Sequence, residues 1–271
     1  MDASVRTVGE CSDMSHEAKV LVIILKGATK HNNDNIKQLQ EIFSSSYFHT
    51  IVLDVGKPPI IPINLSITQA QYIDNYRMLK VLNYSRYHYG SMPCLVVRDN
   101  SVSNLSPSDM ANKVNDSLRA QSDMVFLCVW NDLCNKYADV SEAKNQMGSS
   151  VVWTVQPTAT QAVLYSTTAR EYIIEQLNTT NNTISGVINI AVGSGALLAV
   201  AFVPNILDYD INLATQNSDF SKLNQCSTAS TNNTPVSGTA TLLWFVIIVF
   251  LVLLLAYALI VVGPHTPVVV V

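Results

Sequence analysis

The feature that most constrains this chain is an apolar run that begins at Thr241 and ends at Val262. It contains 22 residues and has no charged residue, no amide side chain and no proline. About 20 apolar residues, each rising about 1.5 Å in a helix, cross the roughly 30 Å hydrocarbon core of a bilayer. A buried core helix is the alternative, but such helices are usually shorter and keep a polar edge. We therefore predict a transmembrane helix that attaches the chain to a lipid bilayer.

The residues at the ends of this run and around it indicate a single-pass C-terminal anchor. Trp244 and Tyr257 lie toward its two ends, where amphipathic rings favour the interface between membrane and water. No Lys or Arg follows Lys222, so the positive-inside rule gives no orientation, and residues 263–271 form a short tail. Residues 1–16 are polar and lack the apolar core of a secretory signal. We expect the span to insert after synthesis and the main domain to face the cytosol.

The charge and cysteine content of the chain limit which classes of partner and which cellular compartment are expected. The formal net charge is −4 and the chain has no basic block, which argues against nucleic acid. Its five cysteines are an odd number without regular spacing, and this favours free, buried thiols over a disulfide framework. Several Asn-x-Ser/Thr sequons are present, but they would matter only if the domain entered the secretory lumen. A glycosylated receptor-type ectodomain is therefore kept as an alternative.

Strand-like and helix-like segments alternate ahead of the anchor. Strands are expected at residues 19–26, 50–55, 94–97, 124–130 and 151–155, and helices at residues 35–43, 68–89, 106–120 and 161–177. This alternation is typical of βαβ units and predicts an α/β domain, residues 18–225, with a mostly parallel sheet covered by helices on both faces.

The remaining segments complete the domain organisation. Residues 1–17 are expected to form a flexible arm, and the Ser-, Thr- and Asn-rich residues 226–240 a flexible linker. Residues 184–204 are uncharged and apolar but are interrupted by Asn and Gly. We expect this segment to pack on the domain as helix or strand; a second membrane span is the alternative.

Three aspartates lie at the carboxyl ends of predicted strands, and they are the candidates for binding a ligand or metal. In open α/β sheets, ligands bind beyond the carboxyl ends of the strands, so Asp54, Asp99 and Asp132 are expected along one rim. Such carboxylates can hold a divalent cation that bridges a nucleotide diphosphate. An aspartate at a strand end more often caps the following turn, as Asp99 would do ahead of Ser101. No glycine-rich phosphate-binding motif is present in a suitable context.

Three blocks of sequence resemble a known family. They read PCLVVRDNSVSNLSPSDMANKVNDSL, DMVFLCVWNDLCNKY and PTATQAVLYSTTAREYI. Together they resemble the glycosyltransferase-like virion and minor capsid membrane proteins of nucleocytoplasmic large DNA viruses, in particular iridovirus-like viruses. The residues that carry the resemblance are Asp99, Ser101, Cys128, Trp130, Asp132, Cys134, Tyr137, Gln161 and Ser166.

The resemblance implies a type-A glycosyltransferase-like fold. An active enzyme of that fold carries Asp-x-Asp, which holds manganese against a sugar nucleotide, whereas this chain has Asp99-Asn100-Ser101 with a single carboxylate. One carboxylate is a poor site for a divalent ion in competition with water. If the domain were active, Asp99 and Asp132 would be its catalytic residues, Asp99 the metal ligand, and manganese and a sugar nucleotide its cofactors.

The degenerate motif instead implies a domain without catalytic residues, cofactor or metal. The resemblance then implies a structural protein that links the virion inner membrane to the capsid shell. Its partners would be the bilayer and the major or other minor capsid proteins. An active membrane-bound glycosyltransferase is the alternative.

Overall fold

The structure, a computed structural model, describes part of the chain. The described residues are 5–10, 18–27, 33–58, 60–62, 65–128, 138–139, 150–154, 157, 160–203 and 205–209. The chain divides into two compact units, Met1–Cys226 and Ser227–Val271, and every described residue belongs to the first. The predicted linker, membrane helix and tail lie outside the described residues. Among the helices that are described, none has the length and apolar character needed to cross a bilayer.

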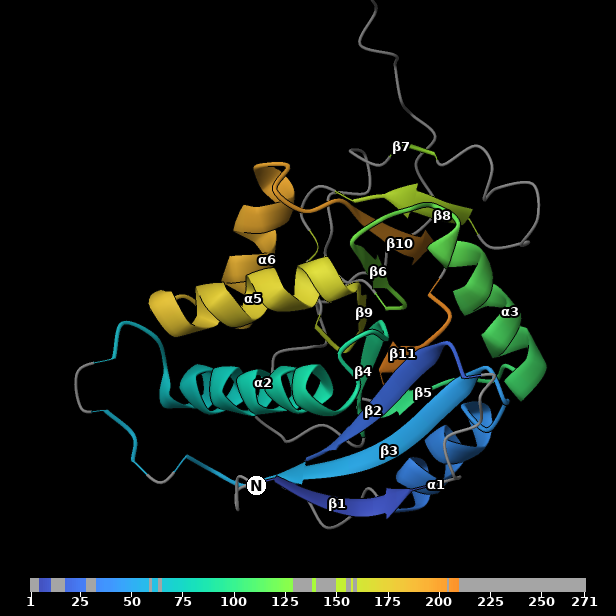
Figure 1. The fold of residues 1–271 in the computed structure, drawn as a ribbon, viewed down its shortest axis with the longest axis horizontal. Coiled ribbons are helices and arrows are strands. Elements are labelled where there is room, and N and C mark those ends of the chain that lie inside the picture. The colour runs from blue at the N-terminus through green and yellow to red at the C-terminus, as the bar shows by residue number, and fades with distance from the viewer. Residues whose placement is uncertain are drawn as a thin grey trace, which may run out of the picture. The chain divides into compact units, whose positions relative to one another are not determined.

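A nine-stranded mixed sheet forms the centre of the described domain (Figure 1). Its strands lie in the order β1-β3-β2-β4-β9-β6-β10-β8-β7. Their bounds are β1 Val5–Glu10, β2 Val20–Lys26, β3 Phe48–Val55, β4 Cys94–Arg98, β6 Met124–Phe126, β7 Ala138–Asp139, β8 Ser150–Trp153, β9 Ala162–Tyr165 and β10 Ala199–Val203. Two further short strands, β5 (Ser101–Val102) and β11 (Asp208–Tyr209), pair with each other.

Most of the strands run in one direction. β2 is parallel to both β3 and β4, and β10 is parallel to β6. β9 lies between β4 and β6 and is antiparallel to both, so β4 and β6 share a direction although they do not touch. We call the side where β2, β3, β4, β6 and β10 end the carboxyl edge, and the side where they begin the amino edge.

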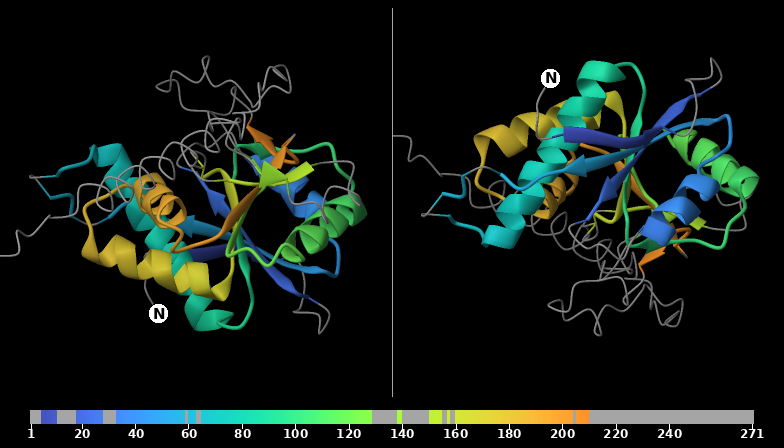
Figure 2. Two further views of the ribbon diagram at one scale, coloured as in Figure 1. Left: turned by 90° about the horizontal axis from the view of Figure 1, so that it is seen from above. Right: turned by 90° about the horizontal axis from the view of Figure 1, so that it is seen from below.

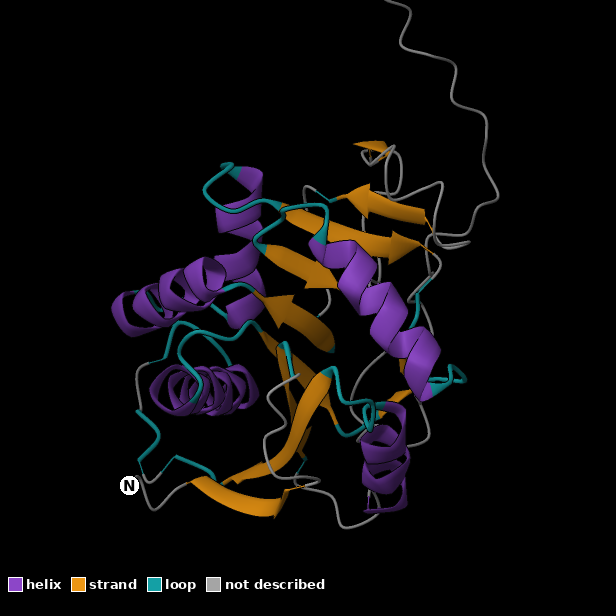
Figure 3. Cartoon of the chain, turned by 45° about the vertical axis from the view of Figure 1, so that its right-hand side comes forward, coloured by secondary structure: helices purple, strands orange, loops and turns teal. Residues whose placement is uncertain are grey.

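Helices cover both faces of the sheet (Figures 2 and 3). α2 (Gln69–His88), α5 (Thr167–Thr179) and α6 (Ile184–Gly193) pack on one face, and α1 (Asn33–Ile42) and α3 (Pro107–Leu118) on the other. Along β2, alternate side chains enter the two cores: Leu21, Ile23 and Leu25 join one, and Val20, Val22 and Ile24 the other. Burial on both faces explains why this strand is a continuous apolar run.

Four helices begin at a Ser or Thr that caps them. The hydroxyls of Thr68, Ser106, Ser166 and Thr183 each accept a hydrogen bond from the backbone N–H three residues later, at 3.0–3.2 Å. These bonds satisfy N–H groups that have no partner inside the helix. In α2 the Gln71 side chain also accepts from the Thr68 N–H, which completes a capping box.

The α/β architecture with helices on both faces is confirmed, but two local predictions are wrong. The sequence predicts a flexible arm for residues 1–17, whereas Val5–Glu10 forms β1, the edge strand antiparallel to β3. The sequence also predicts a mainly helical segment at residues 161–177. There, Ala162–Tyr165 forms β9, and α5 starts only after Ser166. Periodicity does not separate a short apolar strand from the first turn of a buried helix.

Residues 184–204 pack on the domain, as predicted. Ile184–Gly193 forms α6, which at 10 residues is too short to cross a bilayer, and Ala199–Val203 forms β10 inside the sheet.

Candidate functional site at the carboxyl edge

Two of the three predicted aspartates lie close together at the carboxyl edge. Lys26, the last residue of β2, is paired with Asp54 on β3, and Leu25 is paired with Arg98 on β4, immediately before Asp99. The predicted rim is therefore present for Asp54 and Asp99. Asp132, the third predicted member, lies outside the described residues.

Asp99 caps the end of the neighbouring strand. Its side chain is only 4% exposed, and its Oδ2 accepts a hydrogen bond of 2.6 Å from the backbone N–H of Gly27. Its own N–H donates to the Leu25 carbonyl at 3.2 Å. The sequence predicts a cap on the turn that follows Asp99, but the bond to Gly27 joins β4 to the exit of β2 instead.

Gly27 is required by this contact. A Cβ placed on residue 27 would lie 2.9 Å from Oδ1 and 3.0 Å from Oδ2 of Asp99. Real Cβ atoms do not approach oxygen so closely, so any larger residue displaces the carboxylate. The Asp99 carboxylate is thus bonded through one oxygen and packed against the backbone through both.

Side chains from two other parts of the chain hold the loop that contains Asp99. Asn35 Nδ2 donates to the carbonyl oxygens of Asp99, at 2.6 Å, and Ser101, at 2.8 Å. The Gln161 side chain donates to the Asn100 side chain, which joins the first and third blocks of the motif. Both Ser101 and Gln161 are buried, and the Ser101 hydroxyl has no hydrogen-bond partner among the described residues. Asn35 and Gln161 therefore hold the loop after β4 in place.

Two arginines balance the charge of the rim. Arg98 forms a two-pronged ion pair with Asp74 of α2, with N–O distances of 2.6 and 2.9 Å, and Arg77 donates to the Lys26 carbonyl. Burial opposes protonation of Arg98, but the ion pair with Asp74, together with Tyr165 and Asp99, outweighs burial, so the pKa of Arg98 is raised.

Several charged groups of the rim act on the pKa of Arg77. Burial lowers the pKa of Arg77, and repulsion from Arg98 lowers it further. Asp74, Asp99 and Asp54 act in the opposite direction, so all three carboxylates lie within electrostatic reach of this one guanidinium. The carboxylates of the rim are therefore compensated by cations that belong to the chain itself.

This donor set does not fit manganese. A divalent ion of this kind needs several accessible oxygen ligands and open coordination positions. The Asp99 carboxylate is buried and bonded to Gly27, and two guanidinium groups nearby would repel a metal ion. Within the described part of the chain, no three His, Cys, Asp or Glu side chains are grouped as metal ligands.

The middle block of the motif is described only at its start. Cys128 is a buried thiol, and the Asn205 amide donates to its sulfur at 3.7 Å. Trp130, Asp132, Cys134 and Tyr137 lie outside the described residues. Ser166 of the third block is the cap of α5.

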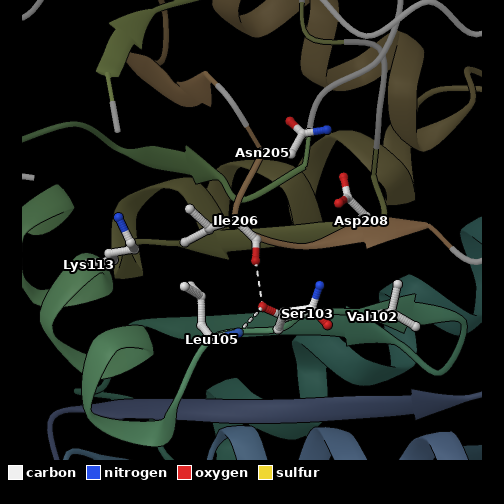
Figure 4. A pocket seen from close by; sticks show the side chains of 8 residues that line it. Val102, Ser103, Leu105, Lys113, Asn205, Ile206 and Asp208 are labelled. Atoms are coloured by element: carbon white, nitrogen blue, oxygen red, sulfur yellow. Dashed lines mark hydrogen bonds between the residues drawn. The ribbon is translucent and has the colours of Figure 1, made fainter. Parts of the chain in front are cut away.

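A pocket that the sequence does not predict lies beside the β5–β11 pair (Figure 4). It has a volume of about 320 Å³ and is lined by Val102, Ser103, Asn104, Leu105, Lys113, Asn205, Ile206 and Asp208. The Ser103 hydroxyl donates to the Ile206 carbonyl at 2.8 Å and accepts from the Leu105 N–H at 3.2 Å. Partial burial raises the pKa of Asp208, and a hydrogen bond from Asn205 opposes the rise. The two walls of the pocket come from segments about a hundred residues apart, so no local sequence pattern predicts the pocket.

Comparison with known proteins assigns no family to the chain. No protein-family model matches it. No curated protein matches it at a significant level.

Proposed function

We propose that this chain is a membrane-anchored structural protein of a virus particle. In this proposal it is a minor capsid protein of an iridovirus-like virus, and it links the virion inner membrane to the capsid shell. Its α/β domain has a type-A glycosyltransferase-like fold but does not transfer sugar, and it contacts the major or other minor capsid proteins.

The state of Asp99 is the observation that carries the non-catalytic part of the proposal. In an active relative, this carboxylate would face a metal ion and a diphosphate. Here it is buried, accepts the Gly27 N–H and lies near Arg77. A carboxylate engaged in this way has a structural role, because freeing it would leave a buried donor unpaired.

Two sequence features support the anchor. Residues 241–262 have the length and apolarity of a membrane helix, and residues 226–240 have the composition of a flexible linker. A domain on such a tether can reach a shell that lies at some distance from the membrane.

Titration calorimetry of the detergent-purified full chain tests catalysis by ligand binding. The chain is titrated with manganese and with a panel of sugar nucleotides, and the melting transition of each sample verifies that the domain is folded. We expect no saturable heat. Metal-dependent binding that weakens in Asp99→Ala would contradict the proposal and favour the active transferase.

Extraction of membranes tests the anchor separately. The full chain should stay in the membrane pellet at alkaline pH, and a variant that lacks residues 227–271 should move to the supernatant. In virus particles, the full chain should cross-link to capsid proteins. A full chain that leaves the pellet with the peripheral proteins would refute the anchor.

A further inference from the structure

We propose that the pocket beside the β5–β11 pair binds a free amino acid with an apolar side chain. Asp208 receives the ammonium group of this ligand, and Lys113 receives its carboxylate. Every residue that lines the pocket belongs to the α/β domain, so this site is independent of the proposed anchor.

The pocket lies where an open α/β sheet offers a ligand site. One wall, residues 102–105, follows the carboxyl end of β4, and the other wall, residues 205–208, follows the carboxyl end of β10. These two strands run in the same direction, because β10 is parallel to β6, and β9 is antiparallel to both β6 and β4. Ligands of such sheets bind beyond the carboxyl ends of the strands, between loops of this kind.

Hydrogen bonds hold the walls of the pocket in place. The Ser103 hydroxyl joins the two walls, because it donates to the Ile206 carbonyl at 2.8 Å. The N–H groups of Ile206 and Leu207 donate to the carbonyl of Leu127, at 3.1 and 3.2 Å. Lys113 lies on α3, a helix that packs against the sheet. A pocket fixed in this way needs little further ordering when a ligand binds.

The two charged residues that line the pocket have opposite signs and lie apart. Figure 4 shows Lys113 on one side of the hydrogen bond between Ser103 and Ile206, and Asp208 on the other side. A dicarboxylate in the pocket would approach Asp208, and a diamine would approach Lys113, and like charges at close range repel. A ligand with one charge of each sign meets an opposite charge at both ends. The pocket therefore favours a zwitterion.

The Asp208 carboxylate gains from a cationic ligand. Burial raises its pKa, because the ionised form loses hydration that its neighbours do not fully replace. A hydrogen bond from Asn205 opposes this rise only in part. An uncompensated charge of this kind lowers stability and is typical of binding sites. An ammonium group supplies the missing compensation, because it brings a positive charge and three hydrogen-bond donors.

The volume and the apolar part of the lining define the size and character of the ligand. The pocket has a volume of about 320 Å³, at the lower end of the range of about 300–1,000 Å³ for ligand pockets. At about 30 Å³ for each water molecule, it has room for about ten non-hydrogen atoms. Val102, Leu105 and Ile206 offer apolar contacts. An amino acid such as leucine matches both this size and these contacts.

Titration calorimetry of the detergent-purified full chain with free leucine tests the site. We expect saturable binding of leucine. Glycine should bind at least about tenfold more weakly, because it has no side chain to bury against the apolar lining. N-acetyl-leucine has no ammonium group and leucinamide has no carboxylate, so each should also bind at least about tenfold more weakly. The melting transition of each sample verifies that the domain is folded.

Two variants assign the ends of the ligand. Asp208→Asn should weaken leucine binding at least about tenfold and remove the preference for leucine over N-acetyl-leucine, while the preference over leucinamide remains. Lys113→Gln should have the reverse pattern. Glu175→Gln on α5 and Lys80→Gln on α2 are matched controls on the opposite face of the sheet, and they should bind leucine as the parent does.

Three results would overturn the proposed site. They are the absence of saturable leucine binding by the folded chain, equal binding of leucine and its two blocked analogues, and leucine binding that Asp208→Asn leaves unchanged. Removal of a buried charge should make Asp208→Asn more stable than the parent at neutral pH, so unfolding would not explain a loss of binding in this variant.

Discussion

At the scale of single residues, Asp99 shows how one position can have the identity of a catalytic group and the environment of a structural one. Its carboxylate is shielded from solvent and receives the N–H of Gly27 from the adjacent strand. Asn35 donates to the carbonyl oxygens of Asp99 itself and of Ser101. The residue type alone is compatible with metal binding, and its partners decide against it.

Gly27→Ala tests whether this contact stabilises the fold. The added methyl group must displace the Asp99 carboxylate, so we expect the free energy of unfolding to fall by about 1–3 kcal/mol in urea titration. In a double-mutant cycle with Asp99→Ala, the two losses should be clearly less than additive, because both changes remove the same contact. Additive losses would show that Gly27 and Asp99 act independently.

Asp208 makes the stability of the pocket wall depend on pH. Burial raises its pKa in the folded state above the unfolded value, so the folded protein takes up this proton first on acidification. The burial penalty is therefore present at neutral pH and is lost as the pH falls through the raised pKa.

Asp208→Asn should remove that penalty. We expect a higher melting temperature than the parent at about pH 7 and no difference at about pH 3, below the pKa of an ordinary aspartate. Asp34→Asn, on the solvent side of α1, is the control and should change neither. A gain for Asp208→Asn that persists at acidic pH would contradict this explanation.

At the scale of elements, Arg170 fastens α5 to the connection between α2 and β4. The residue is 1% exposed, and its guanidinium donates to the carbonyl oxygens of Met92 at 3.1 Å and Gly90 at 2.5 Å. These carbonyls belong to a turn, where the backbone has no helical or strand partner. One buried cation therefore satisfies the turn and fixes the start of α5.

Arg170→Met should loosen this attachment. Arg170→Met removes hydrogen bonds from a buried charged donor to two partly buried carbonyl groups, and we expect a loss of about 1.5–3 kcal/mol in the free energy of unfolding. Arg119→Met, whose ion pair with Asp116 lies at the surface, is the control and should cost less than about 1 kcal/mol. Equal effects of the two variants in urea titration would contradict the proposed role of Arg170.

At the scale of the whole domain, charged side chains gather where the adjacent strands β3, β2 and β4 end. The carboxyl edge gathers Asp54, Asp74, Arg77, Arg98 and Asp99 into a compensated ionic rim.

The sequence by itself determined the elements whose pattern is local. The buried strand at β2 is a continuous apolar run, α2 begins at Thr68 with Gln71 completing its capping box, and the alternation of strands and helices gives the α/β class. Asp54 and Asp99 are likewise expected on one rim, because parallel strands end on the same side of a sheet.

Tertiary structure decided what depends on residues distant in the chain. The edge strand β1 forms because β3 offers its backbone, and the apolar residues of β9 become a strand because β4 and β6 lie on either side. The partner of Asp99 is a glycine 72 positions away, and the pocket joins two segments about a hundred residues apart. Strand pairing and the compensation of buried charges depend on which residues pack together in the folded domain. The order of residues along the chain does not show which distant residues will come into contact.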